Sequence, residues 1–308
     1  MPHPSRFRLH GLVAATHTPF HHDGSLNLAV VENQAAHLLA NGVRYAFICG
    51  TTGESSSLTV AERHTLAEHW LEVTRGSELA VIVHVGANCL ADARAIASQA
   101  QQLGAVAISA LAPSYFKPAS VAALVECMAE IAAAAPELPF YYYEIPTLTG
   151  ITISPSAFLA AAAERIPNLA GLKFTSSNLM EYQLCRAFSE GAFDVPFGSD
   201  EMLLGALVLG ATGAVGSSFN FAAPIYQRLI KAYEAGDVAQ ARAEQLRSVR
   251  LIQCLANRGY MSAAKATMML LGVDVGPPRL PHVALSAQQI EEHRRECEQL
   301  GLFTWLEA

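Results

Sequence analysis

The sequence has few charged residues, no closely spaced cysteines and no long uninterrupted apolar run. Only 15% of its 308 residues are charged and the net charge is −7, so no basic excess favours nucleic acid as a partner. None of the six cysteines forms a C-x-x-C pair, which favours reduced thiols of a cytoplasmic protein over a metal or redox centre. No segment has the ~20 uncharged residues that a membrane helix needs. The N-terminal MPHPSRFRLH also lacks the apolar core of a signal peptide.

Short apolar runs recur along the chain as far as residue 217. They cover residues 11–16, 45–49, 80–85, 105–110, 139–143, 169–174, 194–198 and 213–217. The only charges inside them are Lys173 and Asp194. Continuous apolar runs of this length are typical of strands in a parallel sheet, which are buried on both faces.

Amphipathic segments with a helical period separate these runs. They cover residues 27–41, 59–75, 90–103, 120–135, 154–165, 179–190, 201–209 and 222–235. Thr59 predicts a capping box with Glu62, and Ser120 and Ser154 are plausible N-caps of two further helices. Eight strand–helix units in succession predict a closed (β/α)8 TIM barrel. An open doubly wound sheet is the alternative, but no G-x-G-x-x-G follows the first strand.

The pattern changes after about residue 235, where only helical periods remain. Helices are expected over 237–258, 262–272 and 286–301, and three prolines predict an extended crossover at 273–283. The chain is therefore expected to consist of a barrel that carries the active site, 1–235, and a C-terminal helical extension, 236–308.

Lys173 is the first candidate for chemistry, because in this architecture active sites lie at the C-terminal ends of the strands. It lies inside LAGLKF, where burial of an ammonium is costly unless the group is paired or its pKa falls. A lysine of lowered pKa is a nucleophile that condenses with carbonyl groups. A lysine that reaches solvent from a strand end, or that is paired with a carboxylate, is an equal alternative on position alone.

Three further features lie at the ends of other predicted strands. Tyr143 ends the fifth strand beside Lys173 and is able to transfer protons, although aromatic residues at strand ends usually serve packing. The loop 49–55, CGTTGES, offers backbone N–H groups and hydroxyls to an anion, or is simply a turn. The segment 198–201, GSDE, and Ser217 offer carboxylates and hydroxyls that match a polyol ligand. The alternative is that Asp200 is a solvated helix cap.

The histidines are weaker candidates. His17, His21 and His22 lack the i,i+4 spacing of helical metal ligands, and a solvent-exposed turn explains them. His84 is most simply a core histidine with its hydrogen bonds satisfied. No metal site and no cofactor fingerprint is identified.

Together these segments resemble the Schiff-base 2-oxo-acid aldolase family that includes dihydrodipicolinate synthase and N-acetylneuraminate lyase. The resemblance covers essentially the whole chain, and its most specific motifs are GTTGES, YYYEIPTLTG and GLKFTSSNL, in the family's order. It implies that Lys173 forms a Schiff base with a pyruvate-type 2-oxo acid. The covalently bound lysine then serves as the electron sink, and no cofactor is needed.

The resemblance also implies roles for individual residues. Thr51 links Tyr143 in a proton relay, and Thr51 with Thr52 binds the substrate carboxylate. Tyr115 matches a family position where a tyrosine of a neighbouring subunit completes the relay. The expected assembly is a homotetramer, a dimer of dimers.

Among family members the sequence is similar to the sialic acid lyases. Leu148 stands where the dihydrodipicolinate synthases carry an arginine for the substrate's distal carboxylate. In the lyases, the counterparts of Thr175, Gly198, Asp200, Glu201 and Ser217 bind the sugar's hydroxylated tail. The expected reaction is reversible cleavage of N-acetylneuraminate to N-acetylmannosamine and pyruvate.

One departure from the lyases is Glu144, where they carry asparagine or histidine, and it could alter which sugar is accepted. A 2-keto-3-deoxy sugar-acid aldolase or dehydratase is the alternative within the family. A non-catalytic ligand-binding barrel is the alternative outside it, but such a protein has no need of a buried nucleophile.

Overall fold

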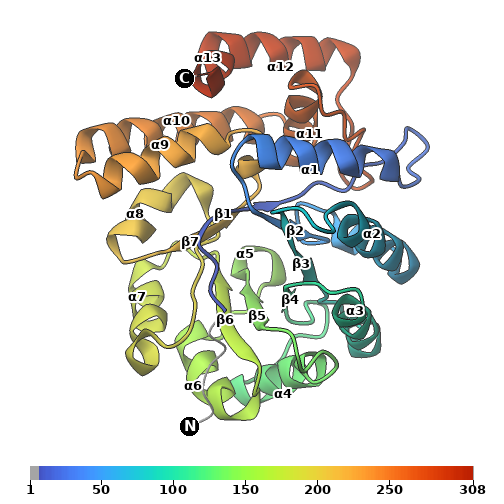
Figure 1. Ribbon diagram of the computed structural model, residues 1–308, viewed down its shortest axis with the longest axis vertical. Helices are drawn as coiled ribbons and strands as arrows, with labels where there is room; N and C mark the ends of the chain where they lie inside the picture. The colour runs from blue at the N-terminus through green and yellow to red at the C-terminus, as the bar shows by residue number, and fades with distance from the viewer. Residues whose placement is uncertain (1–6, 308) are drawn as a thin grey trace.

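A computed structural model describes residues 7–307 of the chain. Seven strands form one parallel sheet in the order β6-β5-β4-β3-β2-β1-β7, and helices surround it (Figure 1). The strands are β1 Gly11–Ala15, β2 Tyr45–Ile48, β3 Ala80–His84, β4 Ala107–Ala110, β5 Phe140–Glu144, β6 Leu169–Phe174 and β7 Gly213–Gly216. Strands β1 to β6 pair in sequence order, and β7 pairs with β1.

The barrel is closed between β6 and β7 by an irregular segment rather than by a regular strand. Asp194 bridges Gly171 of β6, and Phe197 bridges both Phe174 of β6 and Ala214 of β7. The prediction of a continuous strand at 194–198 is therefore wrong in detail. Proline 196 has no N–H to donate to a ladder, which limits regular pairing there. The closure confirms the predicted barrel and excludes the open sheet.

The barrel helices follow the predicted segments closely. They are α1 Val31–Ala40, α2 Val60–Val73, α3 Leu90–Gln102, α4 Val121–Ala132, α6 Pro155–Arg165, α7 Leu179–Ala187, α8 Leu203–Val208 and α9 Ala223–Glu234, and a short helix that was not predicted, α5 Pro146–Thr149, follows β5. Thr59 forms the predicted capping box with Glu62, and Ser120 and Ser154 cap α4 and α6.

Two apolar layers hold these elements together. The barrel interior contains alternating strand residues such as Val13, Phe47, Ile82 and Val215. The second layer lies between strands and helices and includes Trp70, which is fully buried. Burial on both faces explains why the strands read as unbroken apolar runs.

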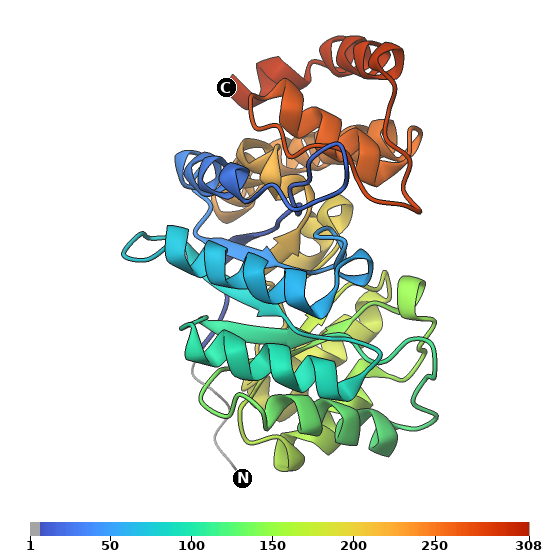
Figure 2. The same cartoon turned by 90° about the vertical axis from the view of Figure 1, so that its right-hand side faces the viewer.

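Four helices follow the barrel, at one end of the molecule in Figure 2. They are α10 Val238–Ala256, α11 Tyr260–Leu270, α12 Ala287–Leu300 and α13 Leu302–Glu307, of which α13 was not predicted. Helix α10 lies along α9 (Figure 1). The crossover 273–283 has neither helix nor strand, as its prolines predicted.

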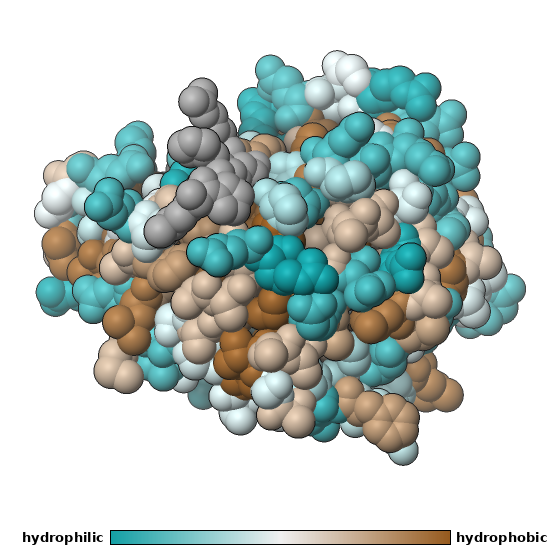
Figure 3. All heavy atoms as spheres, turned by 90° about the horizontal axis from the view of Figure 1, so that it is seen from below, coloured by the Kyte–Doolittle hydropathy of each residue, from teal (hydrophilic) through white to brown (hydrophobic). Residues whose placement is uncertain are grey.

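No helix within residues 7–307 is long and apolar enough to cross a bilayer. In the view of Figure 3, apolar side chains are interspersed with polar ones. The expectation that no signal peptide is present rests largely on residues 1–6, which lie outside the described residues.

Candidate active site

Lys173 and Tyr143 lie side by side because their strands are neighbours and in register. Tyr143 of β5 is paired directly with Lys173 of β6. Both are buried, and Lys173 Nζ lies 4.0 Å from the centroid of the Tyr143 ring and 4.7 Å from that of Phe47. Lys173 is 5% exposed, so it does not reach solvent, and no carboxylate within residues 7–307 forms an ion pair with it. The amine is thus held against the faces of two aromatic rings.

The Tyr143 hydroxyl has one side-chain neighbour suited to proton transfer. Thr51 Oγ1 lies 3.3 Å from it, a long hydrogen bond of the kind that often tightens when substrate binds. The Tyr143 ring packs edge-on against His84. His84 Nε2 accepts from the backbone of Leu111, so Nδ1–H donates to the Cys49 carbonyl at 2.9 Å. Both ring nitrogens of the fully buried His84 are bonded, which confirms the expected core histidine, and burial holds its pKa well below its usual range.

The loop that carries Thr51 is tightly constrained. Cys49 and Glu54 both have positive φ values, 55° and 53°. At Gly53 a β-carbon would lie 3.1 Å from Cys49 N, and Thr18 Oγ1 donates to the Gly53 carbonyl at 2.6 Å. Thr52 is buried within this loop. Non-glycine residues in the left-handed region persist only where the surroundings enforce them, often at functional sites.

A cavity of about 440 Å³ opens where β5, β6 and β7 end. Six of the predicted site residues line it: Tyr143, Thr175, Gly198, Asp200, Glu201 and Ser217. A β-carbon on Gly198 would lie 2.4 Å from Thr175 Cγ2 and 3.1 Å from Lys173 Cε. Only glycine at this position leaves both side chains undisturbed.

The two acids of this cavity have different surroundings. Glu201 is exposed, whereas Asp200 is 6% exposed and accepts hydrogen bonds from Ser218 N, at 2.9 Å, and from Ser218 Oγ. Burial raises the pKa of Asp200 to about 6. The alternative in which Asp200 is a solvated helix cap is therefore wrong, because its carboxylate bonds to the segment after β7.

Tyr260, at the start of α11, was not predicted as a site residue. Its hydroxyl lies 2.7 Å from Ser217 Oγ and it lines the same cavity. The sequence carries no local signal for it, because α11 belongs to the C-terminal helices and meets the barrel rim only through tertiary packing.

Glu144 is 6% exposed and bonds to the backbone instead of facing the cavity. Its Oε2 accepts from Thr175 N at 2.9 Å, and its carbonyl accepts from Thr175 Oγ1 at 2.6 Å. Burial raises the pKa of Glu144 to about 7. The residue therefore positions Thr175, which does line the cavity.

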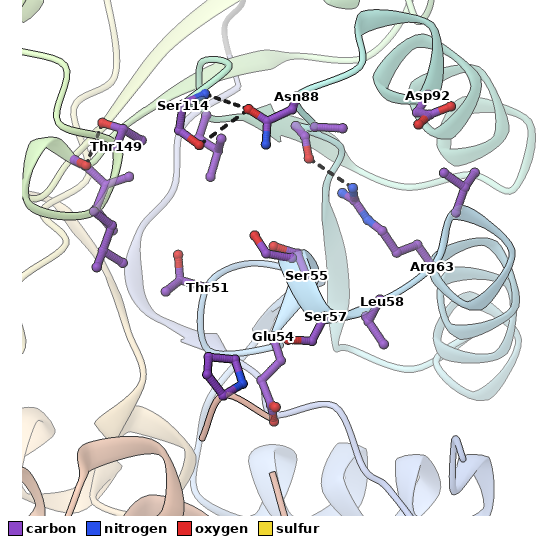
Figure 4. A pocket seen from close by; sticks show the side chains of 18 of the residues that line it. Thr51, Glu54, Ser55, Ser57, Leu58, Arg63, Asn88, Asp92, Ser114 and Thr149 are labelled. Atoms are coloured by element: carbon purple, nitrogen blue, oxygen red, sulfur yellow. Dashed lines mark hydrogen bonds between the residues drawn. The ribbon is translucent and has the colours of Figure 1, made fainter. Parts of the chain in front are cut away.

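A second cavity, of about 420 Å³, is shown in Figure 4, and Ile145 lines both cavities. Thr51 and Leu148 line it, together with polar residues that include Arg63 and Asn88. Leu148 is 65% exposed and offers no charge to a ligand.

Tyr115 is not among the lining residues of either cavity. Its side chain is 79% exposed, with its ring against Phe116, and its backbone N–H donates to Asn88 Oδ1 at 3.0 Å.

The three histidines near the N-terminus lie in different environments. His21 and His22 are exposed, but His17 is fully buried, so the expectation of an exposed turn is wrong for His17. It follows β1, and its ring lies near the Thr52 backbone.

Known proteins resemble this chain over nearly its whole length. N-acetylneuraminate lyase of Rattus norvegicus is 41% identical over 89% of this chain and 87% of its own. The Xenopus tropicalis N-acetylneuraminate lyase is 43% identical, with 89% and 90% covered. The structure of Proteus mirabilis N-acetylneuraminate lyase superposes with a TM-score of 0.93 at 40% identity, covering 96% of this chain and 99% of that one. The model of the dihydrodipicolinate synthetase family matches residues 8–300, and the chain belongs to this family.

Proposed function

We propose that this protein is a Schiff-base aldolase that reversibly cleaves N-acetylneuraminate to N-acetylmannosamine and pyruvate. The names of the relatives support the substrate. The observation that carries the chemistry is Lys173, a buried amine without a carboxylate partner within residues 7–307, in register with Tyr143. A binding protein would have no use for a desolvated amine at this position, whereas a nucleophilic lysine requires one.

The proposed reaction begins when the Lys173 amine adds to the C2 ketone of the open-chain sugar acid and water leaves. The resulting iminium withdraws electrons from the C3–C4 bond. Tyr143, or the substrate carboxylate beside it, takes the proton of the C4 hydroxyl as that bond breaks, which releases the aldehyde. The enamine left on Lys173 is protonated at C3 and hydrolysed to pyruvate. Thr51 passes protons to and from Tyr143.

Binding roles follow from where hydroxyl and carboxylate groups lie. Thr51 and Thr52 would hold the substrate carboxylate through hydroxyl and backbone N–H groups of their constrained loop. The sugar tail would occupy the 440 Å³ cavity, with hydroxyls bonded to Thr175, Gly198, Asp200, Glu201 and Ser217. Carboxylates are strong acceptors for sugar hydroxyls. Leu148 offers no cation for a distal carboxylate, so dihydrodipicolinate synthesis is not expected.

We further propose that Tyr115 acts in the active site of a partner subunit and that the protein is a homotetramer, a dimer of dimers. The exposed aromatic pair Tyr115–Phe116 supports an interface at this loop, since large exposed aromatics are enriched in interfaces.

The cytoplasm is the proposed compartment, in keeping with six free cysteines. We place the barrel domain in residues 1–235 and the helical extension in 236–308.

Trapping with pyruvate and borohydride tests the covalent step. One pyruvyl group per chain is expected, mapped by mass spectrometry to Lys173, and Lys173→Ala should carry none. Lys231→Arg is the control, because it changes an exposed lysine of α9 outside the cavity. Pyruvate release should then be assayed with N-acetylneuraminate and with 2-keto-3-deoxy sugar acids. Cleavage of only the latter would support the alternative family activity, and an adduct elsewhere would refute the mechanism.

A further inference from the structure

Three potential metal ligands meet in the C-terminal helices, outside the cavity at the ends of β5, β6 and β7. Cys254 comes from α10, and His293 and Cys297 come from α12. Their ligand atoms all lie within 4.8 Å of one another. The long separation of the two cysteines in sequence hides this cluster from any analysis of local spacing.

The helices create the cluster by their own geometry. His293 and Cys297 are four residues apart on α12, so they project from the same face of the helix. Both are fully buried, whereas Cys254 is half-buried. Cys254 also lines an open cavity of about 610 Å³, through which an ion and its water could enter.

His293 has the second hydrogen bond that usually orients a metal-ligating histidine. Thr267 Oγ1 donates to the Ala263 carbonyl at 2.9 Å, so it must accept from His293 Nε2–H, 2.8 Å away. This leaves the lone pair of Nδ1 free, 4.0 Å from Cys297 Sγ, which lies 3.6 Å from Nε2 on the same ring. In a tetrahedral zinc site with ligand bonds of about 2.3 Å to sulfur and 2.0 Å to nitrogen, those atoms lie about 3.5 Å apart. A small rotation of the ring closes the difference, and the bond to Thr267 is the outer-shell contact that fixes the tautomer.

The ligand set itself suits a divalent cation. The sulfurs of Cys254 and Cys297 bind metal as thiolates, and Cys254 is reached from the open cavity that it lines. Two thiolates would neutralise a divalent ion in a largely buried site. Glu296 comes within 3.8 Å of Cys254 Sγ but is already bonded to Arg258 through both oxygens. The fourth position is therefore open to water from the cavity.

We propose that Cys254, His293 and Cys297 bind one zinc ion, with water as fourth ligand, and that the ion fastens α12 to α10. The ligand set of two sulfurs and one imidazole nitrogen selects a thiophilic cation such as Zn²⁺ over Mg²⁺ or Ca²⁺, which prefer oxygen. The ion would act on the stability of the helical extension and takes no part in the chemistry at Lys173.

Metal binding is tested on the full chain, reduced, free of any affinity tag and stripped with a chelator. Titration with Zn²⁺ should give one ion per chain, and Co²⁺ should give thiolate charge-transfer absorption with the strong visible bands of a tetrahedral site. Cys254→Ser should abolish the cobalt spectrum and lower the zinc affinity at least about 100-fold, since even outer-shell changes cost 10–100-fold. Cys89→Ser changes an exposed cysteine outside the cluster and should match the wild type. Pyruvate trapping on Lys173 should be the same in all three proteins.

Thiol alkylation gives a second measurement that needs no variant. Zn²⁺ should slow the labelling of Cys254, mapped by mass spectrometry, and leave Cys89 unaffected. The proposal is overturned if the reduced protein binds no stoichiometric ion, if Cys254→Ser keeps the cobalt spectrum, or if zinc leaves Cys254 labelling unchanged. Formation of a Cys254–Cys297 disulfide without any metal binding would likewise overturn it, in favour of a redox pair.

Discussion

Glu54 and Lys265 form an ion pair at 2.9 Å with both side chains almost completely buried. Glu54 belongs to the loop that carries Thr51, and Lys265 belongs to α11 of the helical extension. Lys265 Nζ also donates to the Thr18 carbonyl at 2.9 Å, and Glu54 Oε2 accepts from Arg279 N at 2.8 Å. The extension is thus joined electrostatically to the loop proposed to bind the substrate carboxylate.

Lys265→Met should destabilise the fold strongly, because it leaves the Glu54 carboxylate buried and unpaired. The expected loss is about 3–5 kcal/mol in the free energy of unfolding, measured by urea denaturation. Arg44→Met is the control: its pair with Glu78 is exposed and should be worth less than about 1 kcal/mol. Equal losses of unfolding free energy in the two variants would show that burial does not determine how much the Glu54–Lys265 pair contributes to stability.

Tyr143→Phe should lower kcat by about 10²–10⁴-fold, because it removes the proposed proton-transferring hydroxyl and keeps the ring against Lys173. Pyruvate trapping on Lys173 would slow but persist. Tyr142→Phe removes a neighbouring buried hydroxyl whose ring packs on Phe158, and kcat should stay close to wild type. An unchanged kcat in Tyr143→Phe would return this residue to a packing role.

Glu144 should make the protein less stable as the pH rises. Its pKa is raised from 4.5 to about 7 in the folded state, mainly by burial, so the folded chain binds more protons than the unfolded chain between these values. Stability is then highest below about pH 4.5 and falls through pH 7. Glu144→Gln should remove this contribution, so its unfolding free energy relative to wild type should rise by about 2–3 kcal/mol from pH 5 to pH 8. A difference that does not vary with pH would contradict the raised pKa.

Glu201→Gln should weaken cleavage of N-acetylneuraminate while leaving pyruvate trapping nearly intact. Loss of one charge-assisted hydrogen bond to a sugar hydroxyl costs ~1.5–3 kcal/mol, or roughly 10–150-fold in kcat/KM. Asp200→Asn should show a similar loss, with a further cost in stability because Asp200 accepts two bonds from Ser218. Efficient condensation of pyruvate with aspartate semialdehyde would refute the assignment of specificity.

Tyr115→Phe should lower kcat without changing the structure of its own subunit, since its exposed hydroxyl is proposed to serve a partner. A crystal structure of the assembled protein gives the direct measurement. The Tyr115 hydroxyl is expected within hydrogen-bond or single-water reach of a partner subunit's Tyr143. A separation of more than ~10 Å from every Tyr143 would exclude the shared relay.

The sequence by itself determined most of the elements and their order. Strand and helix periods act over a few residues, so the alternation that predicts the barrel, and caps such as Thr59, are legible without any contact between elements. The place of Lys173 and Tyr143 at neighbouring strand ends follows from the same rule, because consecutive strands of a barrel are adjacent.

Only the tertiary structure decided which distant groups meet. The bond of Asp200 to Ser218, the approach of Tyr260 to Ser217 and the cluster around Cys254 each join elements that local pattern does not relate. Pro196 likewise leaves the eighth barrel position to isolated bridges, although its apolar run resembles a strand. The physical reason is that periodicity fixes which face of an element is buried, whereas the packing of whole helices against the barrel fixes what that face contacts.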